Sequence, residues 1–249
     1  MKKTLLACAL LSSVTGGAAH AATVIGFEIG GDYWQADTGG TFAEKGQPQQ
    51  DFNYDNSSQG SIWVAVEHPV PLVPNVKIRQ NKISDDGGAN VTNFNFAGKQ
   101  YKGAITTDTD LSNTDFVLYY ELLDNDIVSL DFGAAYKLMD GNVRVHQVLA
   151  SGNKHSEKSI DSGIVMGYVD AQVGVPGLGL YGFTDIMMGV DESNVYDYSV
   201  GLGWNFDGTA LDYRVRVGYR DFQFNVNNFD GVTADTQFNG YFAGVEIAF

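Results

Sequence analysis

The sequence predicts an all-β fold, a transmembrane antiparallel up-and-down β-barrel of ten strands. Apolar and polar residues alternate along much of the chain with a period of two, as in strands that have one apolar and one polar face. Short and long links follow one another between the alternating segments. Aromatic residues gather at the segment ends, where a barrel wall meets the two membrane interfaces.

The N-terminus, residues 1–21, is typical of an export signal. Lys2 and Lys3 precede a short apolar run, and Ala19-His20-Ala21 is a small-x-small cleavage site. We therefore expect residues 22–249 to form the barrel. Cys8 is the one cysteine and leaves with the signal, so the mature chain is expected to have no disulfide.

Ten alternating segments predict the strands. Residues 211–220 are a clear example, because Tyr213, Val215 and Val217 alternate with Arg214 and Arg216. Residues 143–150 could extend a strand or form another one, so eight or twelve strands are alternatives. The expected strands are 24–35, 60–68, 76–83, 114–122, 128–137, 163–173, 178–186, 195–206, 211–220 and 240–249.

The links between these strands sort by length. A soluble β-sandwich has no reason to place short links at one end and long ones at the other. Bacterial outer-membrane barrels do so, with an even number of strands, short periplasmic turns and longer external loops. The short links are 69–75, 123–126, 174–177 and 207–210, and the expected external loops, mostly long and polar, are 36–59, 84–112, 138–162, 187–194 and 221–237.

A small barrel in lipid is expected to turn its apolar face outward and to enclose its polar face. Aromatic positions support this orientation, because Tyr and Trp collect at membrane interfaces. We expect an outer belt and an inner belt. The outer belt would contain Tyr33, Tyr136, Tyr196, Tyr198, Tyr219 and Tyr241, and the inner belt Trp204, Phe206 and Phe249.

The chain ends in GYFAGVEIAF, residues 240–249. Unpaired backbone groups cost several kcal/mol in hydrocarbon, so the first and last strands are expected to pair and Phe249 to lie in the wall. The same ending resembles the C-terminal signal that the outer-membrane barrel assembly machinery reads. Its residues would be Tyr241, Val245, Ile247 and Phe249.

Two stretches carry a family resemblance. LSNTDFVLYYELLDNDIVSLDFG (111–133) and GFEIGGDYWQ (26–35) resemble a family of small outer-membrane β-barrel proteins of marine-type gammaproteobacteria. That family is described alongside the GlyGly-C-terminal sorting system. The resemblance implies a location in the outer membrane of a Gram-negative cell and a barrel fold. It implies no activity, cofactor or functional residue.

Composition limits the partners. The formal charge of −15 disfavours nucleic acid as a direct partner. No run of 18 apolar residues is present, so no membrane-spanning helix is expected. We expect contact with outer-membrane lipid and lipopolysaccharide, and with the assembly machinery during biogenesis. No cofactor is predicted, and the sequence leaves the oligomeric state open.

Charged residues on the polar face form the candidate site. An internal ion-pair plug is one interpretation, because buried charges must be paired. A narrow selective channel is the other, because rings of charge set ion selectivity. The polar face also carries Lys137, Asp197, Asp212 and Arg220. The predicted lumen charge network is Glu28, Asp32, Glu67, Lys77, Arg79, Asp115, Glu121, Asp131, Arg214, Arg216 and Glu246.

An embedded hydrolase is the third hypothesis. His68 would lie at a periplasmic turn, and His146 and His155 would lie in an external loop beside Ser156 and Glu157. Catalysis needs a positioned nucleophile and base, which adjacent residues in one loop seldom form. Residues 108–115 are acidic but lack the glycine and distal glutamate of a calcium-binding loop. We therefore predict no catalytic, cofactor-binding or metal-binding residue.

The leading functional prediction is a non-enzymatic outer-membrane barrel with a largely plugged lumen and mobile acidic external loops. Its role would be structural or in surface interaction. A narrow porin-like passive channel for small solutes or ions is the alternative.

Overall fold

The computed structural model describes residues 25–70, 72–125, 127–208 and 211–249. The predicted export signal, residues 1–21, lies outside this part of the chain. No helix long and apolar enough to cross a membrane occurs within the described ranges. The strands are β1 (Gly26–Glu44), β2 (Gln50–Tyr54), β3 (Ser57–Glu67), β4 (Asn75–Lys82), β5 (Ser84–Phe96), β6 (Lys99–Asp110), β7 (Asn113–Asp124), β8 (Val128–Met139), β9 (Gly141–Gln147), β10 (Lys154–Ile160), β11 (Gly163–Gly174), β12 (Leu180–Gly189), β13 (Tyr196–Phe206), β14 (Asp212–Phe229) and β15 (Val232–Ala248).

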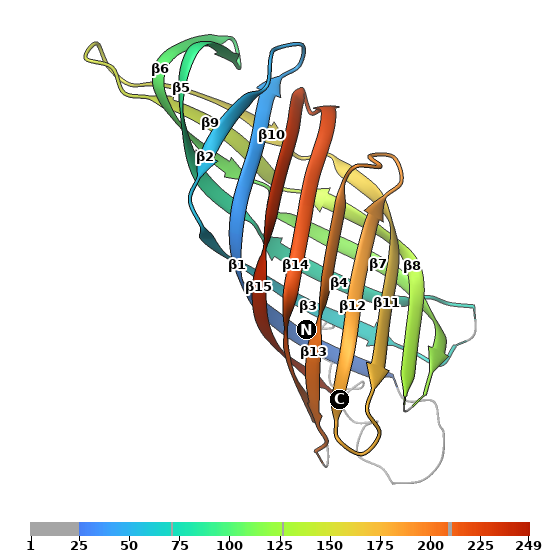
Figure 1. Ribbon diagram of the computed structural model, residues 1–249. Coiled ribbons are helices and arrows are strands. Elements are labelled where there is room, and N and C mark those ends of the chain that lie inside the picture. The colour runs from blue at the N-terminus through green and yellow to red at the C-terminus, as the bar shows by residue number, and fades with distance from the viewer. Residues whose placement is uncertain (1–24, 71, 126, 209–210) are drawn as a thin grey trace, which may run out of the picture.

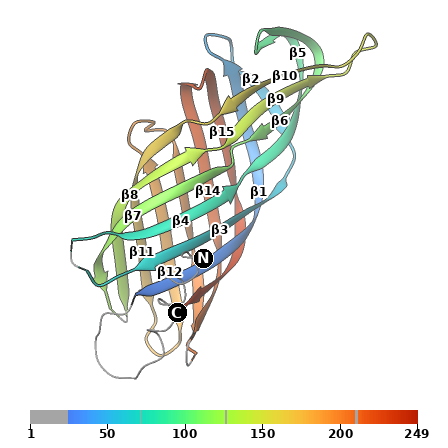
Figure 2. The ribbon, with the colours of Figure 1, turned by 180° about the vertical axis from the view of Figure 1, so that it is seen from behind.

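Ten of the described strands close into an antiparallel up-and-down barrel, in the order β1, β3, β4, β7, β8, β11, β12, β13, β14 and β15 (Figures 1 and 2). Closure occurs where β1 pairs with β15, in a register that places Glu28 opposite Ala248. The backbone of Phe249 exchanges two hydrogen bonds of 2.9 Å with Phe27. The predicted fold class and the pairing of the first and last strands are therefore confirmed.

The remaining five strands form an extension of the barrel wall. The sheet continues from the upper part of β1 through β2, β5, β6 and β9 to β10. These strands lie at the end away from the C-terminus (Figure 1). We call β2, β5, β6, β9 and β10, with the ends of β1, β14 and β15 that lie beside them, the extension.

The expectation of long, mobile external loops is wrong for most of these links. Residues 84–112 and 138–162 contain the hairpins β5–β6 and β9–β10, and 221–237 continues β14 and β15. Residues 143–147 belong to β9, beyond β8, and add no strand to the barrel. The link 187–194 is short, since β12 ends at Gly189 and Gly189 N–H donates to Val195 O.

Side-chain polarity reverses between the barrel and the extension. On β1, Ile29 and Tyr33 face outward and are exposed, whereas Asp32 faces the lumen. Higher on the same strand the inward residues are the buried Trp34 and Phe42, and the outward Asp37 is exposed. The lower part, the barrel wall, therefore has an apolar outer face suited to hydrocarbon and a charged inner face. The upper part has the apolar interior and polar surface of a soluble β-protein.

The extension has an apolar core rich in aromatic rings. Phe42 of β1 stacks on Phe52 of β2, with ring centroids 4.3 Å apart. Phe94 and Phe96 of β5 meet the Phe42 ring edge to face, at 6.0 and 5.4 Å. Phe222, Phe224 and Phe238 of β14 and β15 belong to the same core. This core fills the space between the inner faces of the extension strands, above the lumen.

Asp230 joins the two edges of the extension. It lies at the tip of the β14–β15 hairpin with a φ of 50°. Its carboxylate accepts hydrogen bonds from the backbone N–H groups of Asp161 and Ser162, both 2.9 Å, and from Ser162 Oγ at 2.5 Å. Partial burial raises the pKa of Asp230, but these three hydrogen bonds outweigh it, so the pKa lies below its ordinary value. These hydrogen bonds hold the end of β10 against the tip of the β14–β15 hairpin.

Aromatic rings border the apolar surface at both ends. Trp204 stacks on Phe206 at 6.1 Å and Phe249 on Phe27 at 5.7 Å, at the end where the chain finishes. Towards the extension, Tyr33, Tyr136 and Tyr241 are exposed on the outer surface. Tyr219 packs edge to face on Tyr241 at 5.4 Å. A closed barrel with this apolar surface is suited to the outer membrane. By the usual arrangement of bacterial barrels we expect the short turns in the periplasm and the extension outside the cell, and we call the end with the short turns the periplasmic end.

We expect Val217→Arg to lower the free energy of unfolding by about 2–4 kcal/mol, the cost of a cation near the bilayer midplane on a lipid-facing strand. Val217 is 52% exposed and lies between the two aromatic borders. Gln223→Arg is the matched control, since Gln223 lies on the outer face of β14 beyond the border, opposite Gln237. Urea titrations in lipid vesicles measure both. Equal losses for the two variants would contradict the lipid-facing assignment.

Candidate functional site in the barrel lumen

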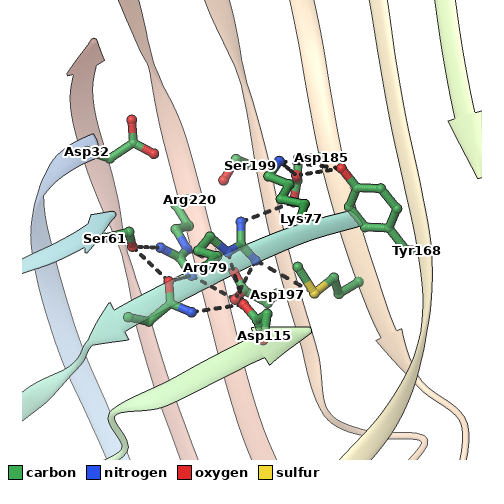
Figure 3. A network of polar contacts seen from close by, with 12 residues as sticks. Asp32, Ser61, Lys77, Arg79, Asp115, Tyr168, Asp185, Asp197, Ser199 and Arg220 are labelled. Atoms are coloured by element: carbon green, nitrogen blue, oxygen red, sulfur yellow. Dashed lines mark hydrogen bonds and ion pairs between the residues drawn. The ribbon is translucent and has the colours of Figure 1, made fainter. Parts of the chain in front are cut away.

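Seven charged side chains from six strands meet at mid-height in the lumen, and we call them the central ion-pair network. Figure 3 shows the members of this network other than Lys137. Each lies on the inward face of its strand, because the strand alternation places every second residue inside. They are buried in the structure, Lys77 slightly less than the others. The network consists of Lys77, Arg79, Asp115, Lys137, Asp185, Asp197 and Arg220.

Asp197 is the centre of this network. Arg220 donates to both of its carboxylate oxygens, from Nε at 2.8 Å and from Nη2 at 2.7 Å. Lys137 Nζ lies 3.1 Å and Arg79 Nη2 3.4 Å from Asp197 Oδ2. Three cations therefore share one carboxylate that is 1% exposed.

Two further aspartates neutralise the cations around it. Asp115 receives Arg79 Nε at 2.9 Å and Lys137 Nζ at 2.8 Å. Asp185 receives Lys77 Nζ at 3.1 Å and Arg79 Nη1 at 3.2 Å. Each buried charge has at least one opposite partner, which offsets the cost of removing it from water.

Neutral side chains add hydrogen bonds to the central network. Arg220 Nη1 donates to Ser61 Oγ at 2.7 Å, and Nη2 donates to Asn81 Oδ1 at 3.0 Å. Asn81 Nδ2 in turn donates to Asp115 at 2.9 Å. A buried polar network of this kind is stable when its donors and acceptors are satisfied, and it leaves little freedom to move.

A second group of ion pairs lies nearer the periplasmic end. Arg214 Nη1 lies 2.9 Å from Glu28 and 2.6 Å from Glu246. Arg216 pairs with Asp32 at 3.1 Å. Its guanidinium also stacks over the ring of Trp63, 4.4 Å from the centroid. Trp63 itself lies so close to Gly30 on β1 that a Cβ there would be 2.2 Å from the ring.

The structure places the eleven predicted lumen charges in three settings. Lys77, Arg79 and Asp115 belong to the central network, and Glu28, Asp32, Arg214, Arg216 and Glu246 form the second group. Glu67 accepts a hydrogen bond from Tyr119 at 3.0 Å, and Glu121 from Asn75 at 3.0 Å. Asp131 Oδ1 is buried and has no hydrogen-bond partner among the described residues.

Sequence reasoning missed Asp170 and Asp185. Both lie in segments where small residues on each face obscure the alternation, so the inward positions could not be identified. The register of β11 with β12 places these two carboxylates opposite one another. A count of polar residues at alternate positions from Tyr168 would have found Asp170.

A cavity of about 510 Å³ opens below the central network at the periplasmic end. We call it the vestibule. Its wall is polar, and residues near the turns, such as Asp124 and Asn125, form its mouth. Above it, a space of only about 10 Å³ remains among Lys77, Arg79, Asp185 and their neighbours. That space holds at most a single water molecule.

The histidines do not form a catalytic group with the predicted neighbours. His68 lies at the turn after β3, where its Nε2 is 3.2 Å from Pro74 O. His146 and His155 are cross-strand neighbours on the outer face of β9 and β10. Ser156 faces the opposite side and shares a 2.6 Å hydrogen bond with Tyr101 in the core. No described serine therefore meets these histidines as a nucleophile.

His146 does contact a carboxylate, since its Nε2 lies 3.1 Å from Asp108 Oδ2 on the exposed outer face of the extension. Asp108 is also opposite Asp86 in the β5–β6 register. Partial burial and this neighbouring carboxyl raise the pKa of Asp86 above its ordinary value. Among the described residues, no group of three acidic or histidine side chains is arranged to hold a metal ion. Asp108 and Asp115, from the acidic segment 108–115, face opposite sides of the wall.

Comparisons with known proteins identify no relative by sequence. A scan of protein-family models and a search of curated proteins found no match. Solved structures with a similar fold include Ail, the attachment invasion locus protein of Yersinia pestis, in complex with the heparin analogue sucrose octasulfate. It is 12% identical, with a TM-score of 0.35, and the match covers 90% of this chain and 99% of that one.

The outer membrane protease OmpT from Escherichia coli is 10% identical, with a TM-score of 0.44, and the match covers 89% of this chain and 97% of that one. A FadL homologue from Pseudomonas aeruginosa is 8% identical, with a TM-score of 0.33 and 90% of both chains covered. At these identities and scores, no ligand, activity or residue role of these proteins is assigned to this chain.

Proposed function

We propose that this protein is a non-enzymatic outer-membrane barrel that does not conduct solutes and has a structural or surface-interaction role. The observation that carries the proposal is that two separate layers of side chains fill the lumen. The central ion-pair network fills it at mid-height, and the apolar core of the extension closes it on the outer side. A solute would have to break both layers to pass.

The extension supports a role at the cell surface. Its core holds the strands together, and its outer face carries charged side chains at neighbouring positions. Asp108 lies opposite Arg144, and Arg144 lies opposite Glu157, to which it is bound at 3.2 Å. A stable, polar sheet outside the membrane can present such a surface to a partner. Contact with lipopolysaccharide, recognition of the C-terminal strand by the assembly machinery, and the link to the GlyGly-C-terminal sorting system stay predictions.

The proposal is tested by planar-bilayer recording on refolded protein. We expect no steady single-channel steps from the wild type or from the double variant Arg214→Ala/Arg216→Ala. This variant removes the second group of ion pairs but leaves the central network and the apolar core in place. Steady steps in the wild type, with an ion selectivity that the double variant changes, would establish the channel alternative.

The non-enzymatic part of the proposal has its own test. Among the described residues, the pair that most resembles a general base and the carboxylate that orients it is His146 with Asp108. A hydrolytic activity of the purified barrel that disappears in His146→Ala and persists in His68→Ala would overturn it.

A further inference from the structure

The vestibule has an excess of negative charge. Seven carboxylates and three cations line it. Lys77 is bound to Asp185, Arg216 to Asp32, and Arg214 to Glu28 and Glu246. The three cations are therefore already paired within the protein. The other carboxylates of the wall form no ion pair in the described structure, and they hydrogen-bond either neutral groups or no group. They are Glu67, Glu121, Asp124, Asp131 and Asp170.

Three of these carboxylates form a row across neighbouring strands. The register places Glu121 of β7 opposite Asp131 of β8, and Asp131 opposite Asp170 of β11. Like charges directly opposite one another destabilise a sheet. Since neighbouring strands are about 4.8 Å apart, the row extends over about 10 Å of wall. A row of this length is better neutralised by an extended ligand with several positive charges than by one small ion.

An independent feature of the vestibule is Tyr181 on β12. Its side chain lines the cavity although the residue is only 4% exposed. The ring lies against Gly203 of β13, where a Cβ would be 2.4 Å from the hydroxyl oxygen. The hydroxyl oxygen makes no hydrogen bond to any described residue and is accessible from the cavity. It is thus free to bond a ligand in the cavity.

Aromatic rings in this wall and just above it already contact the cation of Lys77. Lys77 Nζ lies 5.8 Å from the ring centroid of Tyr168 and 5.9 Å from that of Trp63. Tyr119, Tyr168 and Tyr181 all line the vestibule. Carboxylates interleaved with aromatic rings are the surroundings in which an organic ammonium group is bound, by ion pairing and by cation–π contact.

We propose that the vestibule binds a linear organic polycation with primary ammonium groups, a polyamine, from the periplasmic side. Each ammonium group has three donors, which can be shared between a carboxylate of the row and the Tyr181 hydroxyl. The volume of about 510 Å³ lies within the range of small-molecule sites. A single divalent metal ion needs converging oxygen ligands, and no such group is present among the described residues.

The test is calorimetric titration of the refolded full-length protein in non-ionic detergent, at constant ionic strength. The probes are spermidine, propylamine and magnesium chloride. We expect saturable binding of spermidine, at least about tenfold tighter than that of either other cation. Asp131→Asn/Asp170→Asn should weaken it at least about tenfold, and Tyr181→Phe about threefold. Both variants should fold, since the first removes a like-charge pair and the second keeps the ring.

The control is Asp37→Asn/Asp235→Asn, which removes two exposed carboxylates on the outer face of the extension and should leave the affinity unchanged. Absence of saturable spermidine binding would overturn the proposal. Magnesium binding as tight as that of spermidine, or equal losses in the vestibule and control variants, would show non-specific attraction to an acidic protein and would overturn it as well.

Discussion

Replacement of Asp197 with alanine is expected to lower the free energy of unfolding by about 3–5 kcal/mol, the cost of removing one partner from a buried charge network. The carboxylate is the shared partner of Arg79, Lys137 and Arg220. Without it, Arg220 loses its only ion pair among the described residues, and the other two cations keep only their remaining partners. The alanine cannot compensate buried positive charge, so the loss exceeds that of a surface ion pair.

The measurement is urea-induced unfolding in lipid vesicles, followed by tryptophan fluorescence. Asp37→Ala removes an exposed carboxylate on the outer face of β1 and should change the free energy by less than about 0.5 kcal/mol. Asp197→Asn keeps hydrogen-bonding atoms without the charge and should fall between the two. If Asp197→Ala were as stable as Asp37→Ala, the network would not be the element that closes the lumen.

The barrel could be predicted from the sequence because its strands carry one strong signal. An outward row such as Tyr213, Val215 and Val217 needs hydrocarbon, and an inward row such as Arg214 and Arg216 needs an enclosed polar space. Short links at one end of the barrel, alternating along the chain with long links at the other, then determine strand direction. The need to satisfy backbone hydrogen bonds in lipid determines closure. These arguments use only local pattern and elementary energetics.

The extension could not be predicted by the same arguments, because its polarity is reversed. On β6, Tyr101 and Ile105 face inward while Lys102 and Ala104 face outward. This strand therefore has the pattern of a strand in a soluble β-sheet. Residues 84–112 contain many polar and small residues, which favoured a loop. The alternation continues beyond the aromatic belt with its two faces exchanged, so a pattern of outward apolar residues does not identify these strands.

The candidate site was predictable in composition but not in pairing. Alternation alone places Arg79 and Asp115 inside the lumen. It does not show that Lys77 pairs with Asp185, which is 108 residues away. Such partners depend on the stagger of all ten strands and on rotamers of long side chains. The vestibule follows from the same three-dimensional detail, since it opens where the central ion-pair network ends.

Phe42→Ala is expected to destabilise the extension by about 3–5 kcal/mol, the usual cost of deleting a buried phenylalanine ring. Phe42 is 1% exposed and contacts the rings of Phe52, Phe94 and Phe96. It joins β1 to β2 and β5, which otherwise share few backbone hydrogen bonds, since β2 pairs with β5 at only two positions. The effect should be local, because the barrel wall closes without β2 and β5.

Hydrogen exchange resolved by peptide distinguishes the two regions. Protection in β2, β5 and β6 should fall by at least about a hundredfold, since each 1.4 kcal/mol is a factor of ten. Protection in β12 and β13, within the barrel, should be unchanged. Phe42→Leu keeps an apolar side chain and should lose less, and Asp51→Ala, an exposed residue of β2, should lose almost none. Uniform loss of protection in barrel and extension would show that they unfold as one unit. The apolar core of the extension would then stabilise the barrel wall as well as close its outer end.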